Sequence, residues 1–437
     1  MRRGSRLVIA CVLAGFALRV AFALFYWVNQ PLTHDEREYL ALGRSVARGE
    51  GFQYPADEPQ PGTAQQFGRA PGYPLFLGAL HVTAPADRAP RRVQIAQACL
   101  GALIVWLIAA IAGRAAGPRA AVAAAAIAAV YPPLVWTPAY ILSETLFSAL
   151  ALAAALALQV GGWRQEVGGW RQEVGGRRLE AGPPGLHAEG GRLVLAAGGV
   201  LTALALLTRP VMIFFLPLAA LWLWRKRAFA DAALFLLVAA LCVAPWTIRN
   251  YRVYGRWIAV ASEGGVTFWT GNHPLAVGDG DLAANPAIKR AELAFRAAHS
   301  GQSAEELEPL YYRDAMAWIR RDPAAWIALL ARKAFYTVVP AGPSYAVHST
   351  KYVAASVAAY LLVLPAAAAG AWRWRQARRG EGPVALWLMA AATVAAGLVF
   401  FPQERFRIPV IDPALIVTAA LPAGLRNYGR TDRHSDV

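Results

Sequence analysis

The chain alternates between long apolar runs and shorter polar segments, and this pattern predicts a helical membrane protein. A helix needs about 20 apolar residues to cross the hydrocarbon core of a bilayer. Two of the runs, 193–207 and 211–224, are short and separated by Thr208-Arg209-Pro210, so they either cross separately or form one re-entrant feature. We predict an all-α polytopic membrane protein with about ten transmembrane helices, at residues 7–28, 93–113, 120–136, 139–160, 193–207, 211–224, 228–245, 352–371, 384–401 and 408–425.

Basic residues between the runs predict which helix ends face the cytoplasm. Short loops rich in Arg and Lys favour the cytoplasmic side. With ten spans, such loops all fall on one side, at residues 1–6, 114–119, 163–192, 225–227, 373–379 and in the tail 426–437. Two long segments, 29–92 and 246–351, then face outward. We therefore expect one membrane domain, residues 1–425, whose first outer loop carries the chemistry, and a cytoplasmic tail after it.

The expected cytoplasmic loop 161–192 is rich in Gly and contains the sequence GGWRQEV twice, at 161–167 and 168–174. Two copies of seven residues cannot form a repeat architecture. Because loops tolerate insertions, we interpret the pair as a local duplication without a functional role.

Composition narrows the class of partners. The chain is 57% hydrophobic and has a formal net charge of +16, which would be compatible with nucleic-acid binding if the basic residues were clustered. They are instead spread over many short loops, a distribution that membrane topology and anionic lipid phosphates explain better. The three cysteines lie in apolar runs, so no disulfide framework or thiolate metal site is expected. We expect membrane lipids as partners and no nucleic acid.

The first outer segment begins with an acidic pair directly after an apolar run. Asp35 and Glu36 follow the span 7–28, and an ionisable pair beside lipid is costly unless it has a function or a partner. From residue 35 to 48 apolar side chains recur at helical spacing, and Gly49 ends that pattern. Two interpretations of the pair stay open: carboxylates that carry chemistry, or acids that stabilise the N-terminal end of this helix.

Further helices are predicted in both outer segments. The apolar stretch 73–81 follows Pro71-Gly72 and is too short to span, which predicts a helix lying at the membrane surface. In the second outer segment, residues 285–321 are polar with helical spacing. Asp322-Pro323 then begins another amphipathic helix, which we expect to run to about residue 339.

Several motifs, taken in chain order, resemble one family of membrane enzymes. The first outer segment contains D-E-x-x-Y at 35–39, G-x-G-F at 49–52 and R-x-P-G-Y-P-L-F-L at 69–77. Further matching stretches lie at 140–144, 207–210, 245–250 and 405–409. Together these stretches resemble membrane-embedded GT-C-type glycosyltransferases of the family-39-like branch. That branch is related to dolichyl-phosphate-mannose–protein mannosyltransferases and to bacterial lipid A aminoarabinose transferases.

The resemblance implies an inverting glycosyltransferase at the outer, periplasmic face of a bacterial inner membrane. Its donor would be a sugar linked to a polyprenyl phosphate, and its acceptor a hydroxyl of a glycan, lipid or protein. Such a displacement needs a carboxylate that takes the hydroxyl proton and fixed cations that stabilise the departing phosphate. The sequence contains no P-loop and no G-x-G-x-x-G motif, which argues against a nucleotide-sugar donor.

The motifs also imply roles for individual residues. Asp35 matches the position of the family's catalytic base, and Glu36 either raises the pKa of Asp35 or orients the acceptor. Five residues are expected to bind substrate or lipid phosphate: Arg69, Tyr73, Arg249, Arg405 and Arg407. The simpler alternative for such arginines is contact with lipid headgroups or anchoring at the interface.

Glu144 lies within an apolar stretch and resembles the family's acidic position that faces the active cavity. The alternative interpretation is a buried packing role in which Glu144 pairs with Arg19 or Arg209. Arg19, near the middle of the first span, is likewise expected to be a buried partner.

No metal and no other cofactor is expected. His34, His273 and His348 are scattered, without second ligands at metal-site spacing. The Asp35-Glu36 pair offers oxygen ligands for a divalent ion, but two adjacent acids alone are a weak metal site.

Two other functions remain open from the sequence. One is a ligase or polymerase that moves a whole glycan from a polyprenyl-diphosphate carrier, although the compact first outer segment resembles the single-sugar enzymes more. The other is a lipid or sugar transporter. Transporters tend to place ionisable residues near the bilayer midplane in two corresponding halves, whereas this chain concentrates them on one outer face.

Overall fold

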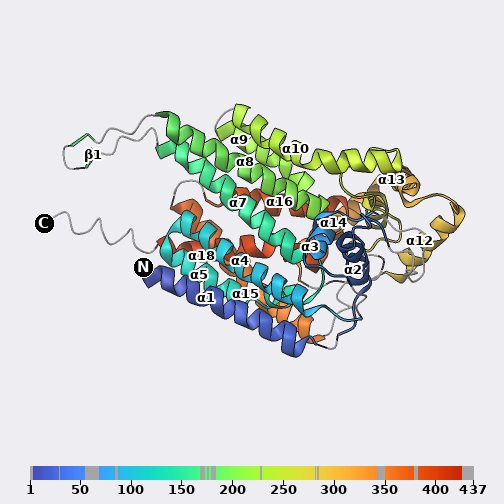
Figure 1. Ribbon diagram of the computed structural model, residues 1–437, viewed down its shortest axis with the longest axis horizontal. Coiled ribbons are helices and arrows are strands. Elements are labelled where there is room, and N and C mark those ends of the chain that lie inside the picture. Colours follow the sequence, from blue (N-terminus) through green and yellow to red (C-terminus); the bar gives the residue numbers. More distant parts are fainter. Residues whose placement is uncertain are drawn as a thin grey trace.

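The computed structural model is a bundle of long helices that carries a group of shorter helices at one end (Figure 1). It describes residues 3–28, 30–54, 68–83, 87–167, 173–174, 177–178, 184–226, 229–280, 282, 285–340, 342, 350–377 and 382–425. The expected tail 426–437 lies outside the described residues, as do most of the second GGWRQEV copy and His348.

In the described residues, six helices are long and apolar enough to cross a membrane. They are α1 (Arg3–Ala21, continued by the π-helical turn η1, Phe22–Tyr26), α4 (Arg91–Ala116), α7 (Glu144–Val167), α8 (Pro184–Thr208), α10 (Phe229–Tyr254) and α15 (Thr350–Gln376). The all-α polytopic class is confirmed. The number of full-length spans is lower than the ten predicted from the apolar runs.

The missing spans are apolar segments that are bent or short. The segment predicted at 120–136 is bent by 66° where α5 (Pro118–Val130) meets α6 (Pro132–Trp136) and the 3₁₀ turn η2 (Thr137–Ala139), and it makes a seventh span if the two halves cross together. Proline lacks the N–H that would continue the helix, so the Pro132-Pro133 pair explains the bend. The remaining apolar helices are shorter: α9 (Phe215–Lys226, after the 3₁₀ turn η3, Pro210–Phe214), α16 (Val384–Val399) and α18 (Ile411–Leu425).

Arg19 stabilises the bend after α5. Its side chain is fully buried, and its guanidinium donates to the carbonyl oxygens of Ala128 at 3.0 Å and Ala129 at 3.1 Å, near the end of α5. The last carbonyls of a helix have no intrahelical donor, so a cation placed there satisfies them and opposes the negative end of the helix dipole. The expectation that Arg19 is buried is confirmed, and its partners are carbonyls.

The long outer segments of the prediction lie at one end of the bundle. Helices α2 (His34–Ala47), α3 (Gly72–Ala79), α12 (Pro286–Ala298), α13 (Ala304–Arg321) and α14 (Pro323–Val338) gather there, at the right of Figure 1. The first residues of α1 and the small hairpin β1 (Glu173–Val174) and β2 (Arg177–Arg178) lie at the opposite end. The polar stretch with helical spacing at 285–321 forms two helices, α12 and α13, and Gly301 between them has a φ of 95°.

Helix α3 packs closely against α2. An added Cβ on Gly43 would lie 2.6 Å from the Cβ of Leu77, and one on Gly78 would lie 2.5 Å from a methyl of Val46. Only glycine permits this separation of the two helices. The buried face of α3 is therefore held against the last two turns of α2.

A buried ion pair holds the beginning of α18. In the short helix α17 (Glu404–Arg407), the Nε atom of Arg407 donates to Asp412 at 2.8 Å, and the Tyr131 hydroxyl donates to the second oxygen of Asp412 at 3.1 Å. The Arg407 guanidinium also lies 3.8 Å from the centre of the Tyr360 ring. Asp412 is completely buried and Arg407 nearly so, so this pair belongs to the packed core.

We expect Arg407→Ala to lower the free energy of unfolding by about 3 to 5 kcal/mol, because Asp412 would stay buried without its cation. Unfolding of the detergent-solubilised protein by heat or denaturant measures the loss. The double variant Arg407→Met with Asp412→Leu is the control and should regain most of the stability, since it removes both charges together. A loss below about 1 kcal/mol for Arg407→Ala would contradict the structural role.

Candidate active site

The candidate site is built on the first turn of α2. Thr33 caps this helix: its hydroxyl accepts from the backbone N–H of Glu36, while the Glu36 carboxylate accepts from the backbone N–H of Thr33 at 2.8 Å. This reciprocal capping box fixes the direction in which the helix begins. It places the side chain of Asp35 in the first turn, at the end of the bundle where the outer helices gather.

Glu36 is used to hold α2 in place. One carboxylate oxygen accepts the Thr33 bonds, and the other accepts the backbone N–H of Ile141 at 2.8 Å. The residue is only 3% exposed, and its burial raises its pKa above the ordinary value. The catalytic role expected for Glu36 stays a prediction, but both of its oxygens are occupied by bonds that position the helix.

Asp35 lies between two arginines that come from distant parts of the chain. Its Oδ1 atom accepts from Arg69 at 3.0 Å and its Oδ2 atom accepts from Arg405 at 2.7 Å. Burial by itself would raise the pKa of Asp35, but the two guanidiniums outweigh this effect and hold the pKa well below the usual carboxyl range. The carboxylate is therefore ionised in this state.

Arg69 is held by three carboxylates. Its Nε and Nη2 atoms both donate to Glu38, Nη2 also donates to Asp35, and Nη1 lies 3.1 Å from a carboxylate oxygen of Glu263. Its guanidinium lies 5.3 Å from the centre of the Tyr39 ring. Although burial opposes the charged form, the carboxylates raise the pKa of Arg69 well above its ordinary value. Arg69 is thus the centre of the cluster and is engaged on each of its three nitrogens.

Two members of this cluster, Glu38 and Glu263, are not among the predicted site residues. Glu38 lies three positions after Asp35 in α2, and residues at that spacing share one helix face, so the helical pattern contained a usable signal. Glu263 lies just before α11 (Gly264–Gly271), in the second outer segment. Its burial raises its pKa, but nothing local in the sequence connects it with the first outer segment.

Arg405 is the more accessible of the two arginines on Asp35. Its side chain is 34% exposed, against 17% for Arg69. Its Nε atom donates to Gln403 at 2.9 Å, and its guanidinium lies 5.3 Å from the centre of the Phe406 ring. The structure therefore brings three of the predicted residues together, Asp35, Arg69 and Arg405, and leaves Arg405 nearest to solvent.

The predicted cavity acid Glu144 pairs with Arg209 at 2.7 Å. This confirms one of the two partners that the sequence offered for a buried packing role. The Arg209 guanidinium lies 5.0 Å from the centre of the Phe406 ring, the same ring that Arg405 contacts. The Glu144–Arg209 pair is thus linked to Arg405 through their shared contact with Phe406.

The other predicted binding residues have partners elsewhere. Arg249 donates to the carbonyl oxygen of Phe52 at 3.1 Å and lies over the rings of Phe52 and Trp246 at 5.8 and 4.9 Å, so it ties the loop after α2 to α10. Tyr73 is fully buried and donates to Gln97 at 3.0 Å. Arg407 is in the core pair with Asp412. These contacts are with the bundle and the loop after α2, and Tyr73 also packs edge-on against Tyr39, the ring beside Arg69.

The donor groups of this site do not suit a metal ion as they are arranged. The described residues hold no group of three or more His, Cys, Asp or Glu side chains that could bind a metal. Each oxygen of Asp35 already accepts from a guanidinium, and guanidinium donors compete with a cation for the same lone pairs. The expectation of metal-independent chemistry stays a prediction.

Known structures share this fold. The Archaeoglobus fulgidus oligosaccharyltransferase tethered with an acceptor peptide aligns with a TM-score of 0.55 and 14% identity, over 96% of this chain and 49% of that one. The same organism's oligosaccharyltransferase AglB, in complex with an inhibitory peptide and a dolichol-phosphate, aligns with a TM-score of 0.50 and 14% identity, over 96% and 50%. The chain spans about half the length of these proteins. The GT-C-type fold that the motifs implied is confirmed.

ArnT from Cupriavidus metallidurans bound to undecaprenyl phosphate aligns over 95% of this chain and 77% of that one, with 13% identity and a TM-score of 0.41 that is too low to support a conclusion. No protein-family model matches the sequence, and no curated protein matches it. The likeness to solved structures therefore establishes the fold and leaves the activity to be argued from the site.

We expect Glu36→Ala to lower the free energy of unfolding by about 1 to 3 kcal/mol, because it removes both the helix cap and the bond to Ile141. The matched control is Glu306→Ala, since Glu306 forms the same capping box with Ser303 at the exposed start of α13. That variant should cost about 1 kcal/mol or less. Thermal unfolding in detergent measures both losses, and equal losses would contradict a tertiary role for Glu36.

Proposed function

We propose that the protein is a glycosyltransferase that moves a sugar from a polyprenyl-phosphate carrier to an acceptor hydroxyl, with inversion, at the outer face of a bacterial inner membrane. The observation that carries this proposal is the contact between the Asp35 carboxylate and the accessible Arg405 guanidinium at one end of a membrane bundle. A proton acceptor and a phosphate-binding cation in direct contact are what a displacement of phosphate by a hydroxyl requires.

The fold supports a lipid-linked donor. The archaeal oligosaccharyltransferases are described with an acceptor peptide and with dolichol-phosphate, and both proteins cover nearly all of this chain. The outer face is supported by the distribution of basic loops along the sequence, since the span count places the short Arg-rich loops, which favour the cytoplasm, on the side opposite to the segment that contains Asp35.

The chemical step is a single displacement at the anomeric carbon. The acceptor oxygen forms a bond to that carbon while the bond from the carbon to the phosphate oxygen breaks, and the electron pair leaves with the phosphate. The proton of the acceptor hydroxyl passes to the carboxylate of Asp35. The N–H groups of Arg405 stabilise the charge that develops on the departing phosphate.

Donor binding prepares the base. A phosphate that binds Arg405 competes with Asp35 for the same N–H groups. Once Arg405 turns to the phosphate, Asp35 loses one of the two cations that depress its pKa. The pKa of Asp35 then rises, and a carboxylate with a pKa closer to the working pH is a better general base.

The proposal assigns three of the other predicted residues to positioning. Arg69 is engaged by three carboxylates, so we assign it to holding Asp35 rather than binding phosphate. Glu36 holds the helix that carries Asp35. Arg249 ties the loop after α2 to α10.

A second candidate is transfer of a whole glycan, as the oligosaccharyltransferase name of the aligned archaeal structures indicates. The same site geometry serves both reactions, since each displaces a lipid-linked phosphate group. Mass spectrometry of the products obtained with lipid-linked mono- and oligosaccharides distinguishes the two.

We expect Asp35→Asn to leave folding intact and to lower the transfer rate by about 1,000-fold, because the amide accepts no proton at neutral pH. Transfer of radiolabelled sugar from a panel of undecaprenyl-phosphate sugars in membrane vesicles measures the rate. The control is Asp87→Asn, which changes an exposed acid of the same outer segment and should retain the wild-type rate. Wild-type turnover of Asp35→Asn would remove the base from the mechanism.

We expect Arg405→Gln to lower kcat/KM and to move the acid limb of its pH profile to higher pH. The ionised form of Asp35 is the active one, so activity falls as pH drops through its pKa in the free enzyme. Removing a cation raises that pKa, and burial raises it further. Arg37→Gln, at an exposed position of α2, is the matched control and should leave the profile unchanged. An acid limb at the wild-type pH in Arg405→Gln would contradict the coupling.

A further inference from the structure

The segment that delivers Arg405 to Asp35 begins at the end of α16. The helix ends at Val399, residues 400–403 are extended or irregular, and α17 carries Arg405. Lys333 belongs to α14, yet its side chain is fully buried against this helix end. The proposed reaction gives this lysine no role.

The Lys333 ammonium caps α16 from outside the helix. Its Nζ atom donates to the carbonyl oxygens of Leu398 at 3.0 Å and Val399 at 3.5 Å. Carbonyls in the last turn have no intrahelical donor, and a positive charge at this end is favourable because of the helix dipole.

Asn272 completes the contact. Its side-chain nitrogen donates to the carbonyl of Val399 at 2.8 Å, and its side-chain oxygen accepts from Lys333 at 3.1 Å and from the indole of Trp326 at 3.0 Å. We call Lys333, Asn272 and Trp326 the α16 clamp. Asn272 follows α11 and the other two belong to α14, and together they hold the carbonyls of Leu398 and Val399 at the end of α16.

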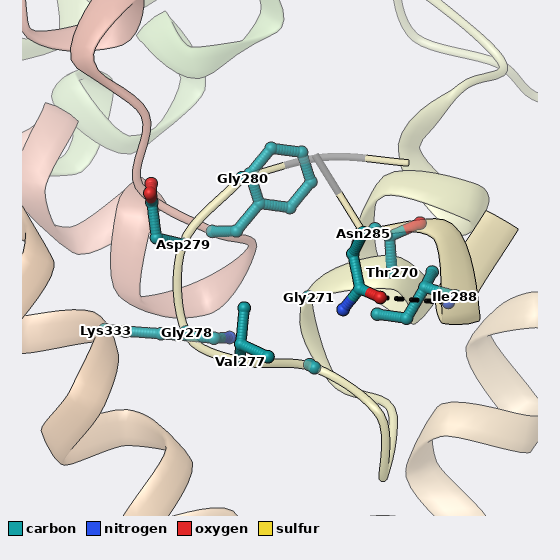
Figure 2. Close-up of a pocket in the computed structure, with 11 residues that line it drawn as sticks. Thr270, Gly271, Val277, Gly278, Asp279, Gly280, Asn285, Ile288 and Lys333 are labelled. Carbon is teal, nitrogen blue, oxygen red and sulfur yellow. Dashed lines mark hydrogen bonds between the residues drawn. The ribbon is translucent and has the colours of Figure 1, made fainter. Parts of the chain in front are cut away.

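The chain after the clamp is packed tightly on the same elements. Gly271 approaches the Phe400 carbonyl so closely that a Cβ would overlap it, and the backbone N–H of Gly280 donates to the Pro402 carbonyl at 3.3 Å. Figure 2 shows Lys333 extending from α14 into the wall of a small cavity beside Gly278. Phe401 lines the same cavity.

Burial of this lysine has a cost that its contacts must offset. An ammonium group removed from water is disfavoured, and burial lowers the pKa of Lys333 to about 7. The oxygens that it contacts, on Leu398, Val399 and Asn272, are all neutral. A methionine would fill a similar volume without that cost, so packing alone does not account for a lysine here.

Residues 400–406 therefore run between two buried anchors. The α16 clamp holds the residues before them, and the Arg407–Asp412 pair holds the residue after them. Arg405 lies inside this short segment and reaches Asp35 at 2.7 Å. A backbone shift at either anchor displaces Arg405, because the segment between the anchors is too short to adjust its conformation around that shift.

We propose that Lys333 is a positioning residue. It fixes the end of α16 and thereby holds the Arg405 guanidinium within hydrogen-bonding distance of the Asp35 carboxylate and of the lipid phosphate. The inference rests on the proposed function for the identity of the phosphate. The clamp itself acts through Arg405 and touches neither substrate nor reacting atoms.

Hydrogen exchange of the full chain in detergent tests the clamp without any assay of activity. We expect Lys333→Met to speed exchange of amides 399–407 by about tenfold and to leave α12 and α13 unchanged. Lys289→Met is the matched control, since Lys289 is 45% exposed on α12, and it should change nothing at 399–407. Asn272→Ala gives a second, independent disruption and should speed the same amides.

Binding of undecaprenyl phosphate tests the link to Arg405. We expect Lys333→Met to weaken binding about tenfold in the wild-type background and less than about twofold in the Arg405→Gln background, because residues that act through one another are not additive. Tryptophan fluorescence titration in detergent gives the dissociation constants of the four proteins in this cycle.

Three results would overturn the proposal. The first is unchanged exchange at 399–407 in both Lys333→Met and Asn272→Ala. The second is an equal fold loss of binding in the two backgrounds, and the third is faster exchange throughout the chain in both variants. The second and third would each assign Lys333 to stability only. Failure of the wild type to bind undecaprenyl phosphate would instead refute the proposed function, and the exchange result would still decide whether the clamp orders residues 399–407.

Discussion

The ion-paired state of Asp35 is the constraint on which the site depends. A carboxylate beside a membrane is stable only with compensating charge, and here the compensation comes from Arg69 and Arg405. Arg69 is itself stabilised by Glu38 and Glu263. The result is a connected network rather than a single pair, so each charge depends on the placement of several others.

This network explains why the two outer segments pack together. Asp35, Glu38 and Arg69 belong to the first segment, Glu263 to the second, and Arg405 to the end of the bundle. Charges removed from water are costly unless their partners are in place, so the arrangement of the outer helices and the order of the site are coupled. The bond from Glu36 to Ile141 and the α16 clamp also keep these charged partners in place, although neither contact is part of the network itself.

Much of the fold follows from local sequence. Apolar runs long enough for a bilayer predicted six of the long helices, and Thr33 with Glu36 marks the start of α2 as a capping box. The described residues contain six full-length spans, or seven with the bent pair, against about ten apolar runs, because apolar length does not register bends or helix length: the Pro132-Pro133 pair bends one run, and α16 and α18 are short.

The sequence identified Asp35, Arg69 and Arg405 as candidates, because each lies in a motif that resembles those of GT-C-type glycosyltransferases. Their mutual contacts, and the separate places of Tyr73, Arg249 and Arg407, emerge only when distant segments pack. No local sequence pattern predicts that Glu263 pairs with Arg69. Which charges form ion pairs depends on their proximity and burial in three dimensions. The sequence shows which charged residues are present, but only the tertiary structure shows which of them lie together in one site of low dielectric constant.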